Sequence, residues 1–105
     1  MAKQLKFGHD ARENLKEGAG MLFILPKEKI QPFWMKGMNF PLDFVWIRNN
    51  KAVAIHTNIE HPETAGRVIQ IAPAEPVKYV LELNAGKINK CGLEVGDRIE
   101  IDPVN

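Results

Sequence analysis

The sequence predicts an α+β fold dominated by β-structure, a small antiparallel barrel-like or sandwich domain with one or two short helices. Short runs of β-branched and aromatic residues recur along the chain, and glycine, proline or asparagine clusters separate them. Two such runs flank the pair Asn49 and Asn50, which is typical of a β-hairpin. With 105 residues and no linker-like tract, residues 1–105 are expected to form a single domain with one core.

The N-terminal segment predicts a strand followed by a helix. Residues 3–7 have strand character, and Gly8 follows them directly. Asp10 and Glu13 have the spacing of a capping box, so a helix of about two turns is expected to start there. The glycines at positions 18 and 20 would end it.

Two further strands are expected before the hairpin. Residues 21–25 form a continuous apolar run closed by Pro26, and a run this short between breakers favours a buried strand over a helix. Residues 32–36 are a second strand candidate, and residues 37–41 a turn in which Gly37 can take a positive φ.

The hairpin is the clearest local prediction. Residues 43–48 and 51–56 are rich in β-branched and aromatic side chains, and asparagine tolerates the left-handed conformation that a type I′ turn requires. A polar loop is expected over residues 57–67.

The C-terminal part continues the alternation of strands and turns. Residues 68–83 resume strand character, and Pro73 and Pro76 place a break or a sheet edge within them. Residues 84–92 predict one or two helical turns, and residues 93–101 two strand halves bent at a glycine.

The charge balance and the single cysteine limit the classes of partner. The chain has 14 Lys and Arg against 13 Asp and Glu, with no run of one sign, so nucleic acid is not the expected partner. No apolar run is long enough to span a bilayer, and no secretory signal opens the chain. With Cys91 as the single cysteine, these features predict a soluble cytoplasmic protein with no membrane partner.

Four stretches together resemble a known family. They are "GMLFIL", "FWMKGMNFPLDFVWI", "YVLELNAG" and "GLEVGD", in this order and at these spacings. The chain is identified from them, over about residues 18–101, as similar to the small prokaryotic proteins catalogued as domain of unknown function 192. The resemblance implies a compact β-rich domain and no settled activity. The chain departs from the pattern at Gly37, where asparagine is frequent, and in the segment before residue 18.

Asp43 is the residue that most needs an explanation, because it opens an apolar strand. A buried carboxylate costs several kcal/mol unless it is paired or hydrogen-bonded. If Asn49 and Asn50 form the loop, the regular register pairs Trp46 with Val53 and Asp43 with His56. Side chains directly opposite each other have Cβ atoms about 5 Å apart, which is within reach of a hydrogen bond.

Two interpretations of Asp43 follow. In the structural one, its carboxylate accepts backbone N–H groups from the turn before it and determines the Pro41–Leu42–Asp43 corner. In the functional one, Asp43 orients His56 so that the imidazole acts as an acid or base toward a substrate.

The sequence favours a non-enzymatic binding module over an enzyme. Its groove is expected beside Trp34, Lys36, Asp43 and Trp46 and would hold a small molecule or a peptide of a partner protein. The alternative is a small enzyme that uses Asp43 and His56 as an acid/base pair.

No metal or cofactor is expected. The spacing of His56, Glu60 and His61 matches no zinc pattern, and the chain carries no cofactor fingerprint. Cys91 is interpreted as a packing residue, because no histidine or acid is fixed beside it in the sequence.

Overall fold

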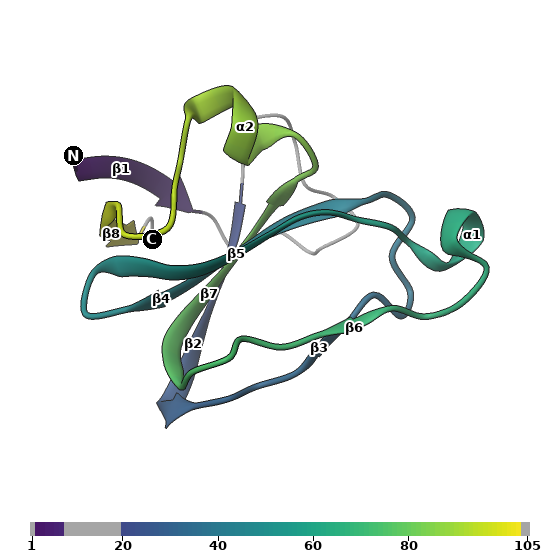
Figure 1. Ribbon diagram of the computed structural model, residues 1–105, viewed down its shortest axis with the longest axis horizontal. Helices are drawn as coiled ribbons and strands as arrows, with labels where there is room; N and C mark the ends of the chain where they lie inside the picture. The colour runs from purple at the N-terminus through teal and green to yellow at the C-terminus, as the bar shows by residue number, and fades with distance from the viewer. Residues whose placement is uncertain (1, 8–19, 104–105) are drawn as a thin grey trace.

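A curled six-stranded sheet dominates the structure, a computed structural model that describes residues 2–7 and 20–103 (Figure 1). The strand order is β1-β8-β5-β4-β7-β2. Neighbouring strands are antiparallel except β1 and β8, which are parallel. β1 approaches β2 across the open side, so the sheet curls into a half-barrel. The strands of this sheet are β1 (Ala2–Phe7), β2 (Gly20–Lys29), β4 (Leu42–Arg48), β5 (Lys51–Ile59), β7 (Val77–Asn84) and β8 (Arg98–Pro103).

A two-stranded ribbon and two short helices complete the described part of the fold. The ribbon pairs β3 (Phe33–Trp34) with β6 (Gln70–Ile71) and lies along the lower edge of Figure 1, away from β1 and β8. Helix α1 (Pro62–Ala65) follows β5, and α2 (Lys87–Cys91) follows β7.

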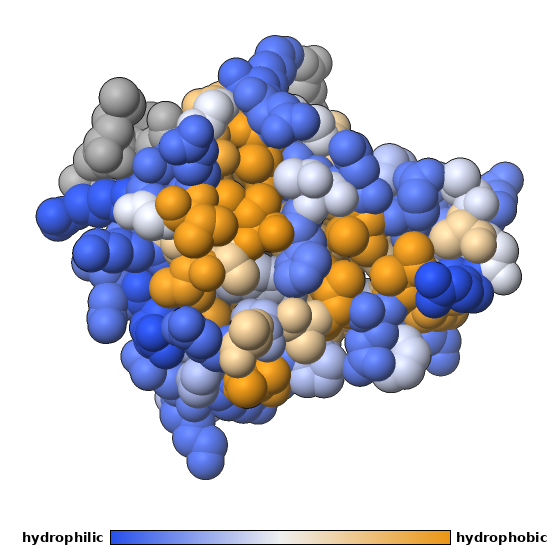
Figure 2. All heavy atoms as spheres, in the orientation of Figure 1, coloured by the Kyte–Doolittle hydropathy of each residue, from blue (hydrophilic) through white to orange (hydrophobic). Residues whose placement is uncertain are grey.

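Both faces of β4 are buried, as its apolar sequence predicts. One face joins a cluster that includes Val45, Ile47, Leu81 and Ile88, which we call cluster 1. The other joins cluster 2, whose buried members are Leu25, Met35, Met38, Leu42, Phe44, Trp46, Val77 and Val80. On the face seen in Figure 2, apolar side chains reach the surface between β5 and β6. A strand covered on both sides is expected to tolerate a charge only with full hydrogen bonding.

The hairpin forms as predicted at its loop, but its predicted register is wrong beyond the first two pairs. Asn49 and Asn50 have φ of 54° and 59°, and Arg48 and Ile47 pair with Lys51 and Ala52. A register shift then places Trp46 opposite Ala54 in place of Val53. An extra residue of this kind is a β-bulge, and it moves every later residue of β5 by one position.

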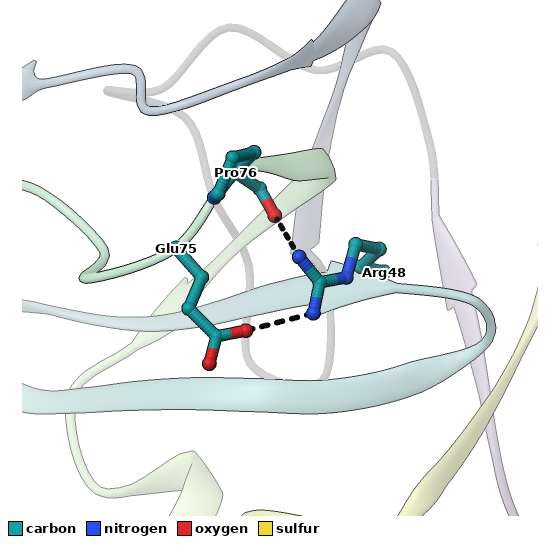
Figure 3. A network of polar contacts seen from close by, with 3 residues as sticks. All are labelled: Arg48, Glu75 and Pro76. Carbon is teal, nitrogen blue, oxygen red and sulfur yellow. Dashed lines mark hydrogen bonds and ion pairs between the residues drawn. The ribbon is translucent and has the colours of Figure 1, made fainter.

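Arg48, at the end of β4, connects the hairpin through hydrogen bonds to the segment that precedes β7 (Figure 3). Its guanidinium donates to the backbone oxygen of Pro76 at 3.1 Å and to Glu75 Oε1 at 2.7 Å. Both side chains are solvent-accessible, so the ion pair contributes at most about 1 kcal/mol. The contact fixes where the chain enters β7.

Most of the predicted elements are confirmed, with three differences. β2 continues through Pro26 to Lys29, with an irregularity in its pairing, and Pro26 is tolerated because β2 is an edge strand. Residues 93–97 form no strand, so the predicted first half of the C-terminal strand is wrong. The predicted loop over residues 57–67 contains the end of β5 and helix α1.

The predicted helix starting at Asp10 lies outside the described residues. No helix within the described residues is long and apolar enough to cross a bilayer.

Candidate functional site

The Asp43 carboxylate is fully buried and accepts three backbone hydrogen bonds. Oδ1 accepts from the N–H of Asn58 at 2.9 Å, and Oδ2 accepts from Gly86 and Ile88, each at 3.0 Å. The three donors belong to the end of β5 and to the start of α2. Bonds from N–H groups to a charged acceptor are among the stronger hydrogen bonds in proteins, so Asp43 joins three segments at one corner.

The Asn58 donor exists because the β4–β5 ladder is irregular a second time. Leu42 pairs with Ile59 and Phe44 with His56, so two residues of β5 face Asp43. Asn58 takes a φ of 53°, a left-handed conformation that asparagine adopts more readily than most residues. A bulged residue loses its ladder partner, and the Asp43 carboxylate supplies the acceptor for its N–H.

The other two donors come from the first turn of α2. The first N–H groups of a helix have no acceptor within the helix. Gly86, at the N-cap, has a φ of 91° and no side chain to cap the helix itself. Asp43 therefore caps α2 from a distant strand, and its negative charge suits the positive end of the helix dipole.

The predicted pair of Asp43 with His56 does not form. His56 pairs with Phe44, so its side chain lies on the cluster 2 face of the sheet, whereas Asp43 lies on the cluster 1 face. The physical reason is the bulge, which moves His56 by one residue and so turns it to the opposite face. The structural interpretation of Asp43 was right in the kind of bond and wrong in its source, because none of the three donors described above belongs to residues 38–41.

His56 has a different partner, Trp46. The indole Nε1–H of Trp46 donates to His56 Nδ1 at 2.7 Å, and Trp46 is fully buried. Because Nδ1 accepts this bond, the neutral imidazole carries its proton on Nε2. Burial lowers the pKa of His56 from its usual value of 6.5, which favours this neutral form.

A small open pocket lies next to the Asp43 corner. It has a volume of about 270 Å³ and is lined by Phe40, Pro41, Asn84 and Ala85. Its walls are the residues that lead into β4 and out of β7, and the N–H of Ala85 lies 3.4 Å from the oxygen of Pro41. Asp43 lies two residues after Pro41 and Gly86 directly follows Ala85, so the hydrogen bond between Asp43 and Gly86 holds the two walls in place.

Asn84, which lines this pocket, has an unsatisfied polar atom in its side chain. Its Oδ1 is buried and accepts no hydrogen bond from any residue that the structure describes. Such atoms are rare in native proteins, because each costs about 1 to 3 kcal/mol. Sequence reasoning missed Asn84, and the one available signal was a polar residue directly after the strand-like residues 77–83.

The structure does not bring the four predicted groove residues to one surface. Trp34 and Lys36 are exposed at and just beyond β3, whereas Asp43 and Trp46 are fully buried on opposite faces of β4. Trp46 packs edge-to-face with Phe33 and stacks on Phe44, with ring centroids 5.6 and 6.1 Å apart. Asp43 and Trp46 therefore act on any ligand only through the residues that they position.

The other candidate side chains make local contacts. Among the residues that the structure describes, no three His, Cys, Asp or Glu side chains lie close enough together to hold a metal ion. Cys91 is partly buried against cluster 1, and its thiol lies 3.6 Å from the backbone oxygen of Ile88. His61 is the N-cap residue of α1 and lies within hydrogen-bonding distance of Thr64.

Comparisons with known proteins agree with this fold. One similar crystal structure is that of a protein from Sinorhizobium meliloti 1021, described as a candidate transcription regulator. Its sequence is 32% identical to this chain and its TM-score is 0.71, and the match covers 92% of this chain and 78% of that one. A second similar crystal structure is that of a protein of unknown function from Novosphingobium aromaticivorans DSM 12444. Its sequence is 23% identical and its TM-score is 0.72, and the match covers 92% of this chain and 71% of that one. At this identity, the likeness shows only that the two proteins share a fold. A search of the curated proteins finds no match.

The family model described as an uncharacterized ACR, domain of unknown function 192, matches residues 2–101. This match covers nearly the whole chain and includes the stretch "FWMKGMNFPLDFVWI" with its Pro-Leu-Asp corner. The chain belongs to the family of domain of unknown function 192.

Proposed function

We propose that the chain is a non-enzymatic binding module that holds a small molecule in the pocket between residues 40–41 and residues 84–85. The observation that carries this proposal is Asn84, which lines the pocket and whose buried Oδ1 has no hydrogen-bond donor among the described residues. A ligand that brings an N–H or O–H group to this amide would supply the missing bond.

The pocket walls also favour a particular kind of ligand. Phe40 and Pro41 offer flat apolar surfaces, and the volume of about 270 Å³ lies just below the range of drug-sized sites. A ligand of one planar ring that carries a hydrogen-bond donor suits these dimensions. The Asp43 carboxylate supports the pocket from outside, because its Oδ2 accepts the N–H of Gly86, the residue that follows Ala85 in the pocket wall.

An acid/base mechanism has no support in this geometry. Asp43 uses both of its carboxylate oxygens on backbone amides, and His56 uses Nδ1 as an acceptor for the indole of Trp46. The two side chains lie on opposite faces of the sheet. They therefore cannot act as the pair that an enzyme of this kind would require.

A thermal-shift screen with single-ring compounds that carry N–H donors tests the proposal. A ligand present at about 100 times its Kd adds about 2.7 kcal/mol of stability, which raises Tm by about 10 °C in a domain of this size. In Asn84→Leu the shape is kept and the acceptor removed, so this shift should disappear. The same variant without ligand should be as stable as the parent or more so, because an unsatisfied atom has been removed.

The matched control is Asn89→Leu, which changes an exposed asparagine on α2, outside the pocket. It should leave the ligand-induced shift unchanged. A hit that stabilises Asn84→Leu as much as the parent, or a library in which no compound shifts the parent, contradicts the proposal.

A double-stranded DNA fragment belongs in the same screen because of the description of the Sinorhizobium relative. The near balance of 14 basic and 13 acidic residues predicts that it has no effect.

A further inference from the structure

The outer face of the β3–β6 ribbon is apolar where a solvated face would be polar. Exposed and covered residues alternate through both segments of the ribbon, and Phe33, Met35, Ile69 and Ile71 point inward to cluster 2. Strands with one face in water usually place polar residues outward. Here the exposed positions of the two segments are Ile30, Pro32, Trp34, Lys36, Val68, Gln70, Ala72 and Ala74.

The largest of these side chains are well exposed. Trp34 is 52% exposed, Ile30 51% and Val68 37%. Trp34 pairs with Gln70, and the N–H of Met35 donates to Ile69, so Val68 lies diagonally across from Trp34. Contiguous exposed apolar residues of this kind mark interaction surfaces.

Three exposed cations lie in or beside the two segments of this face. Lys29, Lys36 and Arg67 are exposed, and neither residues 29–38 nor residues 66–74 contain an acidic residue. The acidic residues that flank these ranges are Glu28, which is exposed beside Lys29, and Glu75, which is paired with Arg48. A chain that is nearly neutral overall therefore has one cationic ribbon with an apolar outer surface.

The size of the face decides between a protein partner and a lipid surface. The two segments that carry the exposed residues, 30–36 and 68–74, are each about seven residues long and cover roughly 20 by 10 Å, or about 200 Å². A stable protein interface needs about 800 Å² from each partner. A bilayer has no such requirement, because lipids adapt to a narrow apolar ridge.

We propose that the outer face of the β3–β6 ribbon docks onto an anionic membrane surface. Trp34 lies at the headgroup level, where its amphipathic ring is favoured, and Ile30 and Val68 contact the acyl boundary. Lys29, Lys36 and Arg67 bind anionic headgroups. The sequence predicted no membrane partner because no segment can span a bilayer, but a surface contact needs no span.

Flotation with vesicles of phosphatidylcholine and phosphatidylglycerol in equal amounts tests this proposal. The protein should float with these vesicles at low salt, and both high salt and pure phosphatidylcholine should abolish flotation. Neutralising two cations in Lys36→Gln/Arg67→Gln should lower the partition coefficient about 30-fold. On vesicle binding, the fluorescence of Trp34 should shift to the blue, while the fully buried Trp46 should not respond.

Matched controls separate the ribbon from surface properties in general. Lys51→Gln/Arg98→Gln removes two exposed cations from β5 and β8, and it should float like the parent. Val68→Ser should weaken flotation, whereas Val95→Ser, at a 62% exposed site outside the ribbon, should not. Equal flotation of parent and Lys36→Gln/Arg67→Gln overturns the proposal, as does failure of the parent to float. A dimer seen by light scattering and lost in Trp34→Ser would also overturn it, because the face would then belong to a second copy of the chain.

Discussion

At the scale of single residues, Asp43 shows how a charge can lie inside an apolar strand. Its carboxylate has lost all contact with water, and three backbone N–H groups replace the lost hydration. Those N–H groups would otherwise have no acceptor, since one belongs to a bulge and two to a helix start. The N–H groups therefore replace the water that the carboxylate has lost, and the carboxylate is the acceptor that these N–H groups lack.

Asp43→Asn should lower the free energy of unfolding by about 1 to 3 kcal/mol. The amide keeps the shape of the side chain but replaces one acceptor oxygen with an N–H donor, which then faces a backbone donor. Urea unfolding of the variant measures the loss. Asp97→Asn is the control, because Asp97 Oδ2 accepts the N–H of Glu94 in an exposed turn. Equal losses in both variants would show that Asp43 has no special role.

His56 should make stability depend on pH. Burial lowers its pKa in the folded protein below 6.5, so the unfolded chain binds more protons as the pH falls. Stability should therefore be fully present above about pH 7. It should be lost progressively as the pH falls through 6.5 toward the lower folded-state pKa. Protonation also puts a hydrogen on Nδ1, which opposes the Trp46 indole N–H.

The measurement for His56 is urea unfolding across this pH range in the parent and in His56→Gln. Glutamine can accept the Trp46 hydrogen bond and does not titrate, so the difference between the two curves isolates His56. A difference that stays constant with pH would contradict the shift. In a double-mutant cycle, the coupling of His56→Gln with Asp43→Asn should be near zero, because the two side chains lie on opposite faces of the sheet.

At the scale of secondary structure, what could be predicted depends on whether a signal is local. The hairpin loop was predictable because two asparagines directly specify a left-handed turn. The bulges at Val53 and near Asn58 were not, because nothing in residues 51–59 marks which residue leaves the ladder. Since the side-chain period of a strand is two, that single missed bulge put His56 on the wrong face and created a false acid/base pair.

The candidate site was predictable only in part for the same reason. The need of Asp43 for hydrogen bonds followed from its own position in an apolar run. Two of its three donors, Gly86 and Ile88, lie more than 40 residues away, and the sequence gives no local indication that α2 starts beside β4. The pocket residue Asn84 was missed because its neighbours in space, Phe40 and Pro41, are equally distant in sequence.

The second bulge gives a prediction for β5. Asn58→Val should destabilise the protein by about 1 to 2 kcal/mol, because a β-branched residue is disfavoured at a φ of 53°. Asn58→Gly should be nearly neutral, because glycine accepts this conformation and keeps the N–H that Asp43 accepts. Thermal unfolding of the two variants measures the difference. The reverse order of stability would mean that the left-handed conformation at Asn58 is not what β5 requires.

At the scale of the whole molecule, β4 and β7 form the shared wall between the two apolar clusters. Alternate residues of the same strands supply Val45 and Leu81 to cluster 1, and Phe44 and Val80 to cluster 2. Neither cluster can lose its packing while these strands stay in place, and neither strand is stable without a covered face. This arrangement predicts that the two faces unfold together.

Two probes on opposite faces can test this cooperativity in one urea titration. In a Trp34→Phe background, the fluorescence of the buried Trp46 reports cluster 2, and the labelling rate of the Cys91 thiol reports cluster 1. Cys91 should react slowly in the native protein, and both probes should show the same midpoint and the same slope, as two-state unfolding requires. If Cys91 became reactive at a lower urea concentration than Trp46 responds, α2 would open as a separate unit. The three Asp43 hydrogen bonds, two of which hold the start of α2, would then be insufficient to couple that helix to the sheet.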